Sequence, residues 1–229
     1  MDKDAMMEMR EQINREEKAR KLENYRQQNM YVKPGQILFT GSSLMEYFPI
    51  SEYWMEENLT EKTGCFAYNR GIAGCTTDEF LQAIDIMMLD LEPSVIFINI
   101  GTNDITPQED GSNWLDHLVR NYDEILRIGR ESLDAVFYLM AYYPVCRKVL
   151  EQDPLRREKF VLRTKENLAL ANSEVEALAA KYGAKYIDVN EGLYDEDGDM
   201  KEDFTVEGVH MFSEAYRIVL NNLRPYLKR

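Results

Sequence analysis

Three segments of the sequence carry residue types that could together perform acyl transfer. Ser43 follows a short apolar run and a glycine, and Asn103 follows a longer apolar run. Near the carboxyl end, Glu207 stands three residues before His210, with a glycine between them. A carboxylate so placed can fold back onto the imidazole, fix its tautomer and stabilise its cation. Ser43 is thereby a candidate nucleophile, His210 its base and Glu207 the orienting acid.

Other features could stabilise the negative charge that develops on a carbonyl oxygen during acyl transfer. Residues 69–74 include two glycines that bracket a short turn, and such turns let backbone N–H groups approach a ligand closely. The side-chain amide of Asn103 can donate a hydrogen bond into the same crevice. Ser43 stands where a strand is predicted to pass into a helix, and N–H groups at such a helix end favour an anion.

The order of these segments resembles the SGNH, or GDSL-type, hydrolase superfamily, which is named after a serine, a glycine, an asparagine and a histidine. Residues 41–43 are similar to its Gly-Asp-Ser block, and residues 69–74 to its second block. Residues 101–104 match its Gly-x-Asn-Asp block, and residues 207–210 are similar to its Asp-x-x-His block. The resemblance covers most of the chain and looks nearest to bacterial platelet-activating-factor acetylhydrolase-like proteins.

The resemblance implies a serine esterase that cleaves small esters through an acyl-enzyme, with no cofactor. It implies that Ser43 is the nucleophile and that Ser43, Gly74 and Asn103 form the oxyanion hole. Ser42 and Glu207 stand where the family usually has aspartate. These two departures motivate an alternative, a catalytically weak or inactive module that binds a small molecule or a carbohydrate on the same fold.

Three other residues offer competing chemistry. Asp203, seven residues before His210, is the nearest rival to Glu207 as the orienting acid. Cys75 could act as a thiol nucleophile, but the lack of a second histidine in a matching segment favours a place in the core or a loop. His117 is the only other histidine, and its position in an amphipathic pattern favours packing on a helix face. The spacing of His, Cys and carboxylate residues fits no metal site, so no metal is expected.

The elements that must position these residues alternate between apolar runs and helical patterns. Five runs are predicted to be strands, at 37–39, 65–68, 95–100, 136–140 and 186–189. Helices are predicted at 76–89, 113–131, 155–182 and 213–227. Continuous apolar runs suit strands that are covered on both faces. The order predicts an α/β fold with a single doubly wound, flavodoxin-like, five-stranded parallel sheet flanked by helices, with ligands at the carboxyl ends of the strands.

The predicted domain organisation is an N-terminal helical extension over residues 1–30 and a hydrolase domain over residues 31–229. The extension is rich in Glu, Lys, Arg and Gln, which favour helix. Its apolar residues are too sparse for a strong stripe, so we expect a helix packed partly on the domain or on a partner. The pattern gives this helix little functional weight.

The composition of the chain indicates which binding partners and which cellular compartment to expect. A formal net charge of -14 repels polyphosphates, so nucleic acid is not an expected partner. The chain lacks an 18-residue apolar run and the apolar segment of a signal peptide, so we expect no membrane insertion and a cytoplasmic location. The three cysteines fit no zinc or redox motif and are expected to be reduced thiols. The expected partner is a small-molecule ester, and the chain could also form a homodimer.

Overall fold

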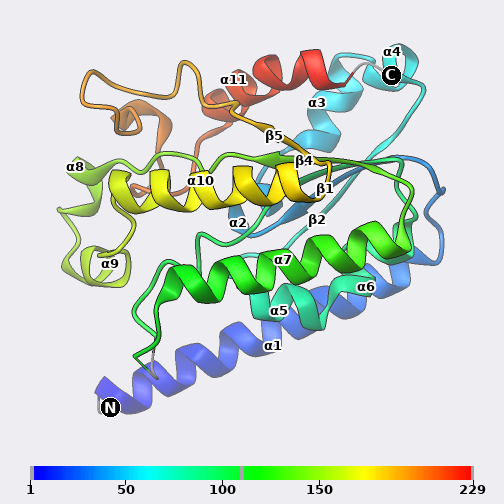
Figure 1. Ribbon diagram of the computed structural model, residues 1–229. Helices are drawn as coiled ribbons and strands as arrows, with labels where there is room; N and C mark the ends of the chain where they lie inside the picture. Colours follow the sequence, from blue (N-terminus) through cyan, green and yellow to red (C-terminus); the bar gives the residue numbers. More distant parts are fainter. Residues whose placement is uncertain (1–2, 109–110, 228–229) are drawn as a thin grey trace.

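A five-stranded parallel sheet forms the centre of the computed structural model, which describes residues 3–108 and 111–227. Its strands are β1 (Ile37–Gly41), β2 (Ala67–Gly71), β3 (Val95–Asn99), β4 (Val136–Met140) and β5 (Lys185–Ile187). The strand order is β2-β1-β3-β4-β5, and every pairing is parallel. This order is that of flavodoxin-like doubly wound sheets, so the predicted fold class is confirmed (Figure 1). The second strand begins two residues later than predicted.

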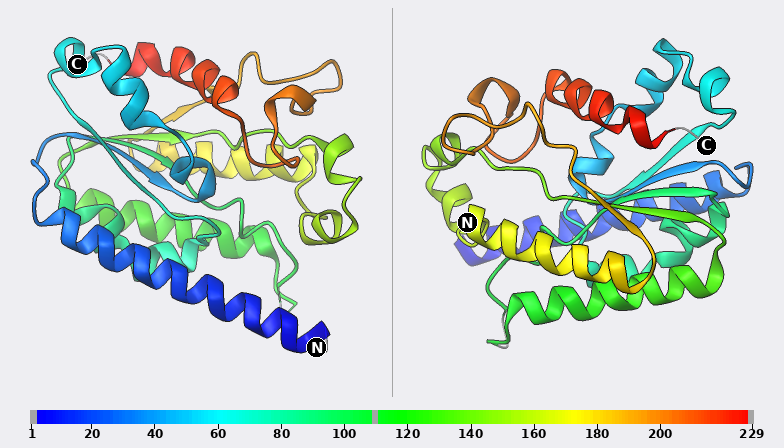
Figure 2. Two further views of the ribbon diagram at one scale, coloured as in Figure 1. Left: turned by 180° about the vertical axis from the view of Figure 1, so that it is seen from behind. Right: turned by 45° about the horizontal axis from the view of Figure 1, so that its top comes forward.

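Helices cover both faces of the sheet (Figures 1 and 2). One face carries α1 (Lys3–Asn29), α5 (Thr77–Gln82), α6 (Ile84–Met87), α7 (Trp114–Ser132) and α10 (Lys165–Lys181). The other carries α2 (Ser43–Glu46), α3 (Ile50–Glu56), α4 (Leu59–Thr63) and α11 (Ser213–Leu223). Side chains alternate along each strand, so Leu38 and Ile96 enter the first core while Phe39 and Phe97 stack in the second. Both faces are buried, which explains the continuous apolar runs.

The predicted single helix over residues 155–182 is wrong, because the structure divides it in two. The short helix α9 (Pro154–Lys159) ends before α10 begins. Thr164 caps α10, since its hydroxyl accepts a hydrogen bond from the Asn167 N–H at 3.2 Å. The interruption buries Arg163, which is 8% exposed. A further short helix, α8 (Arg147–Leu150), precedes this region.

Two other predicted helices are shorter than expected. The segment from residue 76 forms α5, α6 and the 3-10 turn η1 (Leu89–Leu91) in succession. The capping box expected at its start is present, with Thr76 and Glu79 bonding reciprocally. The last helix, α11, follows Phe212 as its N-cap and gives way to η3 (Arg224–Tyr226).

Helix α1 lies within residues 1–30, where a helix was expected, and only part of it is packed. Residues 8–17 are exposed, whereas Tyr25 is 7% exposed within the core shared by α5, α6 and α7. Figure 1 shows α1 lying along the outside of α5 and α6. Among the described helices, none combines the length and apolar character that a membrane span requires.

Candidate active site

The carboxyl end of β1 determines where Ser43 lies. In the sheet register, Gly41 pairs with Gly71 on one side and with Asn99 on the other. Gly41 has a φ of +144°, and a Cβ there would lie 2.0 Å from the Asn99 carbonyl oxygen. Only glycine fits this position. The Ser42 N–H donates to the same carbonyl at 3.1 Å, and the chain then turns into α2, whose first residue is Ser43.

The structure brings Ser43, His210 and Glu207 into one chain of hydrogen bonds. Ser43 Oγ lies 2.9 Å from His210 Nε2. On the other side of the ring, His210 Nδ1 lies 2.6 Å from Glu207 Oε1, which also accepts from the His210 backbone N–H at 3.2 Å. The rival carboxylate, Asp203, is exposed on the 3-10 turn η2 (Glu202–Phe204). The arrangement links a hydroxyl, an imidazole and a carboxylate, as proton transfer from serine requires.

The pKa of Glu207 reflects this contact. Burial by itself raises the pKa of the carboxyl group, but the hydrogen bonds and charge of His210 outweigh burial, and the pKa is lowered from its usual value. Glu207 is therefore an ionised acceptor for the imidazole N–H at neutral pH.

The two adjacent serines differ in their surroundings. Ser42 is 1% exposed, and its Oγ has no hydrogen-bond partner among the described residues. Ser43 is 8% exposed and faces the His210 ring. Of the two hydroxyls, the one on Ser43 therefore has a base within hydrogen-bond distance.

A tight loop presents His210 to Ser43. The Thr205 hydroxyl accepts from the Gly208 N–H at 2.7 Å and donates to the His210 carbonyl at 3.0 Å. Gly208 has a φ of +101°, and a Cβ there would lie 2.5 Å from Leu150 Cγ, so the loop needs glycine at this position. The Tyr47 ring packs edge-on against the imidazole, with a centroid separation of 5.2 Å.

The expected oxyanion donors lie at the ends of the neighbouring strands. Gly74 lies in an exposed turn with a φ of +69°, and its N–H has no protein acceptor within residues 3–108 and 111–227. The Asn103 side chain donates from Nδ2 to the Cys75 carbonyl at 2.9 Å and accepts from Arg163 Nη2 at 2.7 Å. An amide NH₂ has two hydrogens, so the contact with Cys75 leaves the second one for another acceptor.

Arg163 is a residue of the site that the sequence does not single out. Its guanidinium lies over the Phe160 ring at 4.4 Å and donates a hydrogen bond to the side-chain oxygen Oδ1 of Asn103. Burial lowers the pKa of Arg163 to about 10, so the group remains charged at neutral pH. No local motif marks this arginine, because its partner lies 60 residues away in the sequence.

Helix α1 contacts the turn that contains Gly74. Lys18 Nζ donates to the Gly74 carbonyl at 2.8 Å and forms an ion pair with Glu79 at 2.7 Å. The Tyr25 hydroxyl donates to the Gly71 carbonyl at 2.8 Å. The sequence pattern indicated little functional role for α1, but the helix contacts both ends of the turn between Gly71 and Gly74.

A third contact joins α1 to the same turn through a carboxylate. Lys21 forms an ion pair with Glu46, the last residue of α2. The other oxygen of Glu46 accepts from the Ala73 N–H at 2.5 Å. Lys18, Lys21 and Tyr25 recur at helical spacing, so they share one face of α1.

Cys75 and His117, the other residues that could carry nucleophilic or acid–base chemistry, take no part in the hydrogen-bonded chain from Ser43 to Glu207. Cys75 is 2% exposed, and burial raises the pKa of its thiol well above the usual value, which disfavours the reactive thiolate. His117 lies on α7, where its Nε2 is 2.6 Å from Asp78 Oδ2. The fold brings Asp78, Asp104 and His117 together, with ligand atoms within 4.8 Å of one another. Spacing along the chain did not reveal this group.

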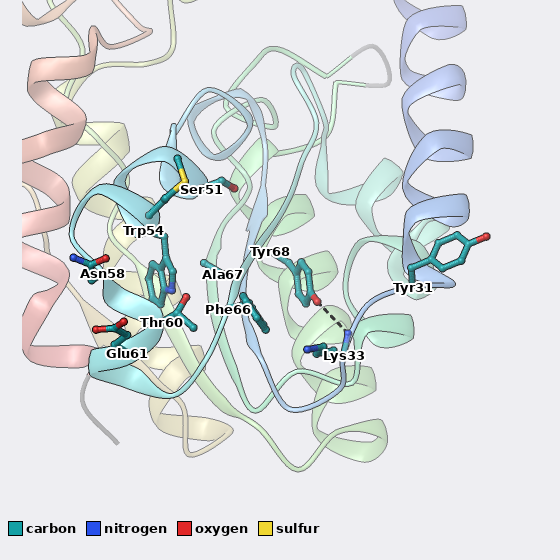
Figure 3. A pocket seen from close by; sticks show the side chains of 11 residues that line it. Tyr31, Lys33, Ser51, Trp54, Asn58, Thr60, Glu61, Phe66, Ala67 and Tyr68 are labelled. Atoms are coloured by element: carbon teal, nitrogen blue, oxygen red, sulfur yellow. Dashed lines mark hydrogen bonds between the residues drawn. The ribbon is translucent and has the colours of Figure 1, made fainter.

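The largest of the described cavities lies away from Ser43, His210 and Glu207. It has a volume of about 640 Å³ and lies beside the edge strand β2 (Figure 3). The rings of Trp54, Phe66 and Tyr68 line it, and the Tyr68 hydroxyl accepts from the Lys33 N–H at 3.0 Å. Ser43 is not among its lining residues, so cavity size alone does not locate the candidate active site.

Solved structures share this fold. A Streptococcus pneumonia protein, assigned provisionally as a platelet activating factor, superposes with a TM-score of 0.82 and 26% identity, over 99% of this chain and 100% of that one. A GDSL-like lipase from Bacteroides thetaiotaomicron gives 0.70 and 20% identity, over 90% and 96% of the two chains. A catalytic mutant of an acetylxylan esterase from Geobacillus stearothermophilus gives 0.62 and 16% identity, over 86% and 98%.

Sequence comparison points to the same family. No curated protein sequence matches the chain. The profile of the GDSL-like lipase/acylhydrolase family matches residues 39–218, which include Ser43, Gly74, Asn103 and His210. This range covers most of the chain, and the resemblance found in the sequence is confirmed. The chain therefore belongs to the GDSL-like lipase/acylhydrolase family.

Proposed function

We propose that this protein is a serine esterase that cleaves small esters with short acyl groups, such as acetyl, through an acyl-enzyme. The observation that carries the proposal is the hydrogen-bonded chain from Ser43 Oγ through His210 to Glu207 Oε1. Family membership supports acyl hydrolysis, and the fold shared with an acetylxylan esterase is compatible with a short acyl group.

The reaction begins with attack of Ser43 Oγ on the ester carbonyl. His210 Nε2 takes the hydroxyl proton, while Glu207 holds the Nδ1–H and stabilises the imidazolium. The N–H groups of Ser43 and Gly74 and the Asn103 amide donate to the oxygen that becomes negative. His210 then gives its proton to the leaving alcohol, and the acyl group stays on Ser43. A water molecule, activated by the same imidazole, releases the acid.

The test uses p-nitrophenyl acetate and purified protein. Ser43→Ala is expected to lower kcat by at least about 10³-fold, because the nucleophile is lost. The matched control is Ser42→Ala, which is expected to keep most of the activity because its hydroxyl has no base beside it. A serine-directed fluorophosphonate is expected to label Ser43 alone. An inactive Ser42→Ala beside an active Ser43→Ala would overturn the assignment of the nucleophile.

A wild-type protein that shows no turnover and yet binds an acetylated sugar would favour the alternative, a binding module on this fold. The direct contact of Glu207 with His210 argues against that alternative, because it supplies the orienting carboxylate that the departure from aspartate had placed in doubt.

A further inference from the structure

A second, smaller cavity lies between α1 and the turn after β2, and it has a volume of about 250 Å³. Residues of α1 between Asn14 and Lys21 form one wall. Tyr47, Ile72 and Ala73 contribute to the other wall. The volume lies just below the roughly 300–1,000 Å³ of pockets for drug-sized molecules, which suits one sugar ring better than a long chain.

This cavity adjoins the candidate active site. Tyr47, which lines the cavity, also packs its ring against His210 at a centroid separation of 5.2 Å. Ala73, on the same wall, immediately precedes Gly74. A group in the cavity therefore lies one side chain away from the imidazole that must protonate the leaving alcohol.

The cavity offers polar groups that the protein leaves unpaired. Lys18 and Lys21 are held in ion pairs with Glu79 and Glu46. By contrast, the Asn14 amide, the Glu17 carboxylate and the Tyr47 hydroxyl make no hydrogen bond within the described part of the chain. An amide, a carboxylate and a phenol together match hydroxyl groups, which both donate and accept. All three side chains are exposed to solvent, so a ligand that enters the cavity must replace the water bound to them, which hydroxyl groups can do and an apolar chain cannot.

The charges around the cavity favour a neutral ligand over an anionic one. The two lysines are neutralised, and the unpaired charge on the wall is the carboxylate of Glu17. Burial first, and then the carboxylates of Glu46, Glu207 and Glu17, raise the pKa of Tyr47. The phenol therefore stays a neutral donor in a negative field, which disfavours phosphate or carboxylate groups.

We propose that this cavity binds the alcohol part of the ester and that this part is rich in hydroxyl groups, such as one sugar ring. The inference rests on the proposed esterase activity and assigns α1 a direct role in substrate choice. Because α1 ends before residue 39, where the family match begins, this specificity would be added to the family's catalytic domain by the N-terminal helix.

The experiment compares two acetyl esters that give the same acyl-enzyme and differ in the alcohol: p-nitrophenyl acetate and a monoacetylated methyl glucoside. The quantity is kcat/KM, which covers the steps through acyl transfer to Ser43. The double variant Asn14→Ala/Glu17→Ala is expected to lower kcat/KM for the glucoside about tenfold, the size of two lost hydrogen bonds. Its kcat/KM for p-nitrophenyl acetate is expected to stay unchanged.

The matched control is Gln12→Ala/Glu16→Ala on the same helix. These two exposed side chains bond to each other at 2.7 Å and do not line the cavity, so both esters are expected to react as with wild type. Unmodified methyl glucoside should inhibit p-nitrophenyl acetate hydrolysis competitively in wild type and more weakly in Asn14→Ala/Glu17→Ala.

The outcomes separate the two proposals. A wild type that hydrolyses neither ester overturns the esterase and the subsite together. A wild type that cleaves p-nitrophenyl acetate but not the glucoside overturns the subsite alone. Equal effects of Asn14→Ala/Glu17→Ala on both esters, or no effect on either, also overturn the subsite and leave the esterase standing.

Discussion

Glu207 stands where the family usually has aspartate, and its longer side chain still reaches the His210 ring. Glu207→Gln is expected to cut kcat strongly, because an amide can donate to Nδ1 and trap the wrong imidazole tautomer. Glu207→Asp should be milder, and Asp203→Asn should behave like wild type because Asp203 is exposed on η2. Steady-state kcat values rank the three variants. A crippled Asp203→Asn beside a normal Glu207→Gln would mean that another carboxylate orients the ring.

Arg163 should act on catalysis only through Asn103. Asn103→Ala is expected to lower kcat by about 10²–10³-fold with little change in KM, because the amide donates most strongly as charge develops. Arg163→Met frees the Asn103 amide to rotate, so it should lower kcat in the same direction by a smaller factor. The double variant should be no slower than Asn103→Ala alone, because the two residues act as one unit. Additive effects would show that Arg163 works by another route.

The contrast between these residues shows what a sequence can predict at this scale. The serine, the carboxylate and the histidine stand in short local patterns next to strand or helix ends, and the fold brings them together as expected. Arg163 and Lys18 belong to no such pattern. Their contacts span 60 and 56 residues, and each depends on how a helix packs rather than on a neighbour in the chain.

Among the elements, α1 shows the largest difference between expectation and structure. Its sparse apolar residues predict a helix packed partly on the domain or on a partner, and residues 8–17 are exposed. The polar face, however, carries the contacts with the turn at Gly74, and polarity patterns do not reveal which lysine meets which carbonyl. The break before α10 differs from the prediction for a similar reason, because the residues on both sides of Thr164 favour helix, whereas its capping bond depends on the local turn of the backbone.

Lys18 is expected to be a positioning residue for the Gly74 turn. Lys18→Met removes the bond to the Gly74 carbonyl and should lower kcat for p-nitrophenyl acetate about tenfold without changing KM, because the lost contact orients a donor used in the transition state. Lys18→Arg should recover part of the loss. The matched control is Arg20→Met, whose exposed guanidinium donates to the Glu16 backbone carbonyl on the same helix. Equal kcat values for Lys18→Met and Arg20→Met would contradict the role.

At the scale of the whole molecule, the layered fold can be predicted from the pattern of apolar and polar residues along the sequence. Individual tertiary contacts cannot. Five apolar runs separated by helical patterns allow few topologies, and the connections of a doubly wound sheet restrict them further. What the runs cannot predict is the tertiary network between layers, such as the one at Asp104. Asp104 follows Asn103 directly and is 3% exposed. Its carboxylate accepts hydrogen bonds from the Thr77 N–H and hydroxyl at the start of α5.

Asp104 should make global stability depend on pH. Burial raises the pKa of Asp104 to about 6, against the bonds from Thr77, which lower it. Unfolded aspartate titrates near 3.9, so between pH ~4 and ~6 the folded state binds more protons, and the free energy of unfolding falls as pH rises, by up to about 3 kcal/mol. Urea unfolding at pH 4 and pH 7 should show this loss in wild type, over and above the change seen in Asp104→Asn. Identical changes in the two proteins would show that Asp104 ionises normally.

The hydrogen bond between Ser43 and His210 joins residues 167 positions apart. On a ribosome that adds about 5–20 residues per second, Ser43 would be synthesised roughly 8–33 seconds before His210. By the end of that interval α1, Ser43 and the Gly74 turn have all been synthesised, yet the serine still has no imidazole beside it. On the proposed mechanism, the nascent chain therefore has no esterase activity until the loop before α11 brings His210 to Ser43. In refolding experiments, recovered esterase activity would consequently report that the loop carrying His210 has packed against the carboxyl end of β1, and not only that the first half of the chain has folded.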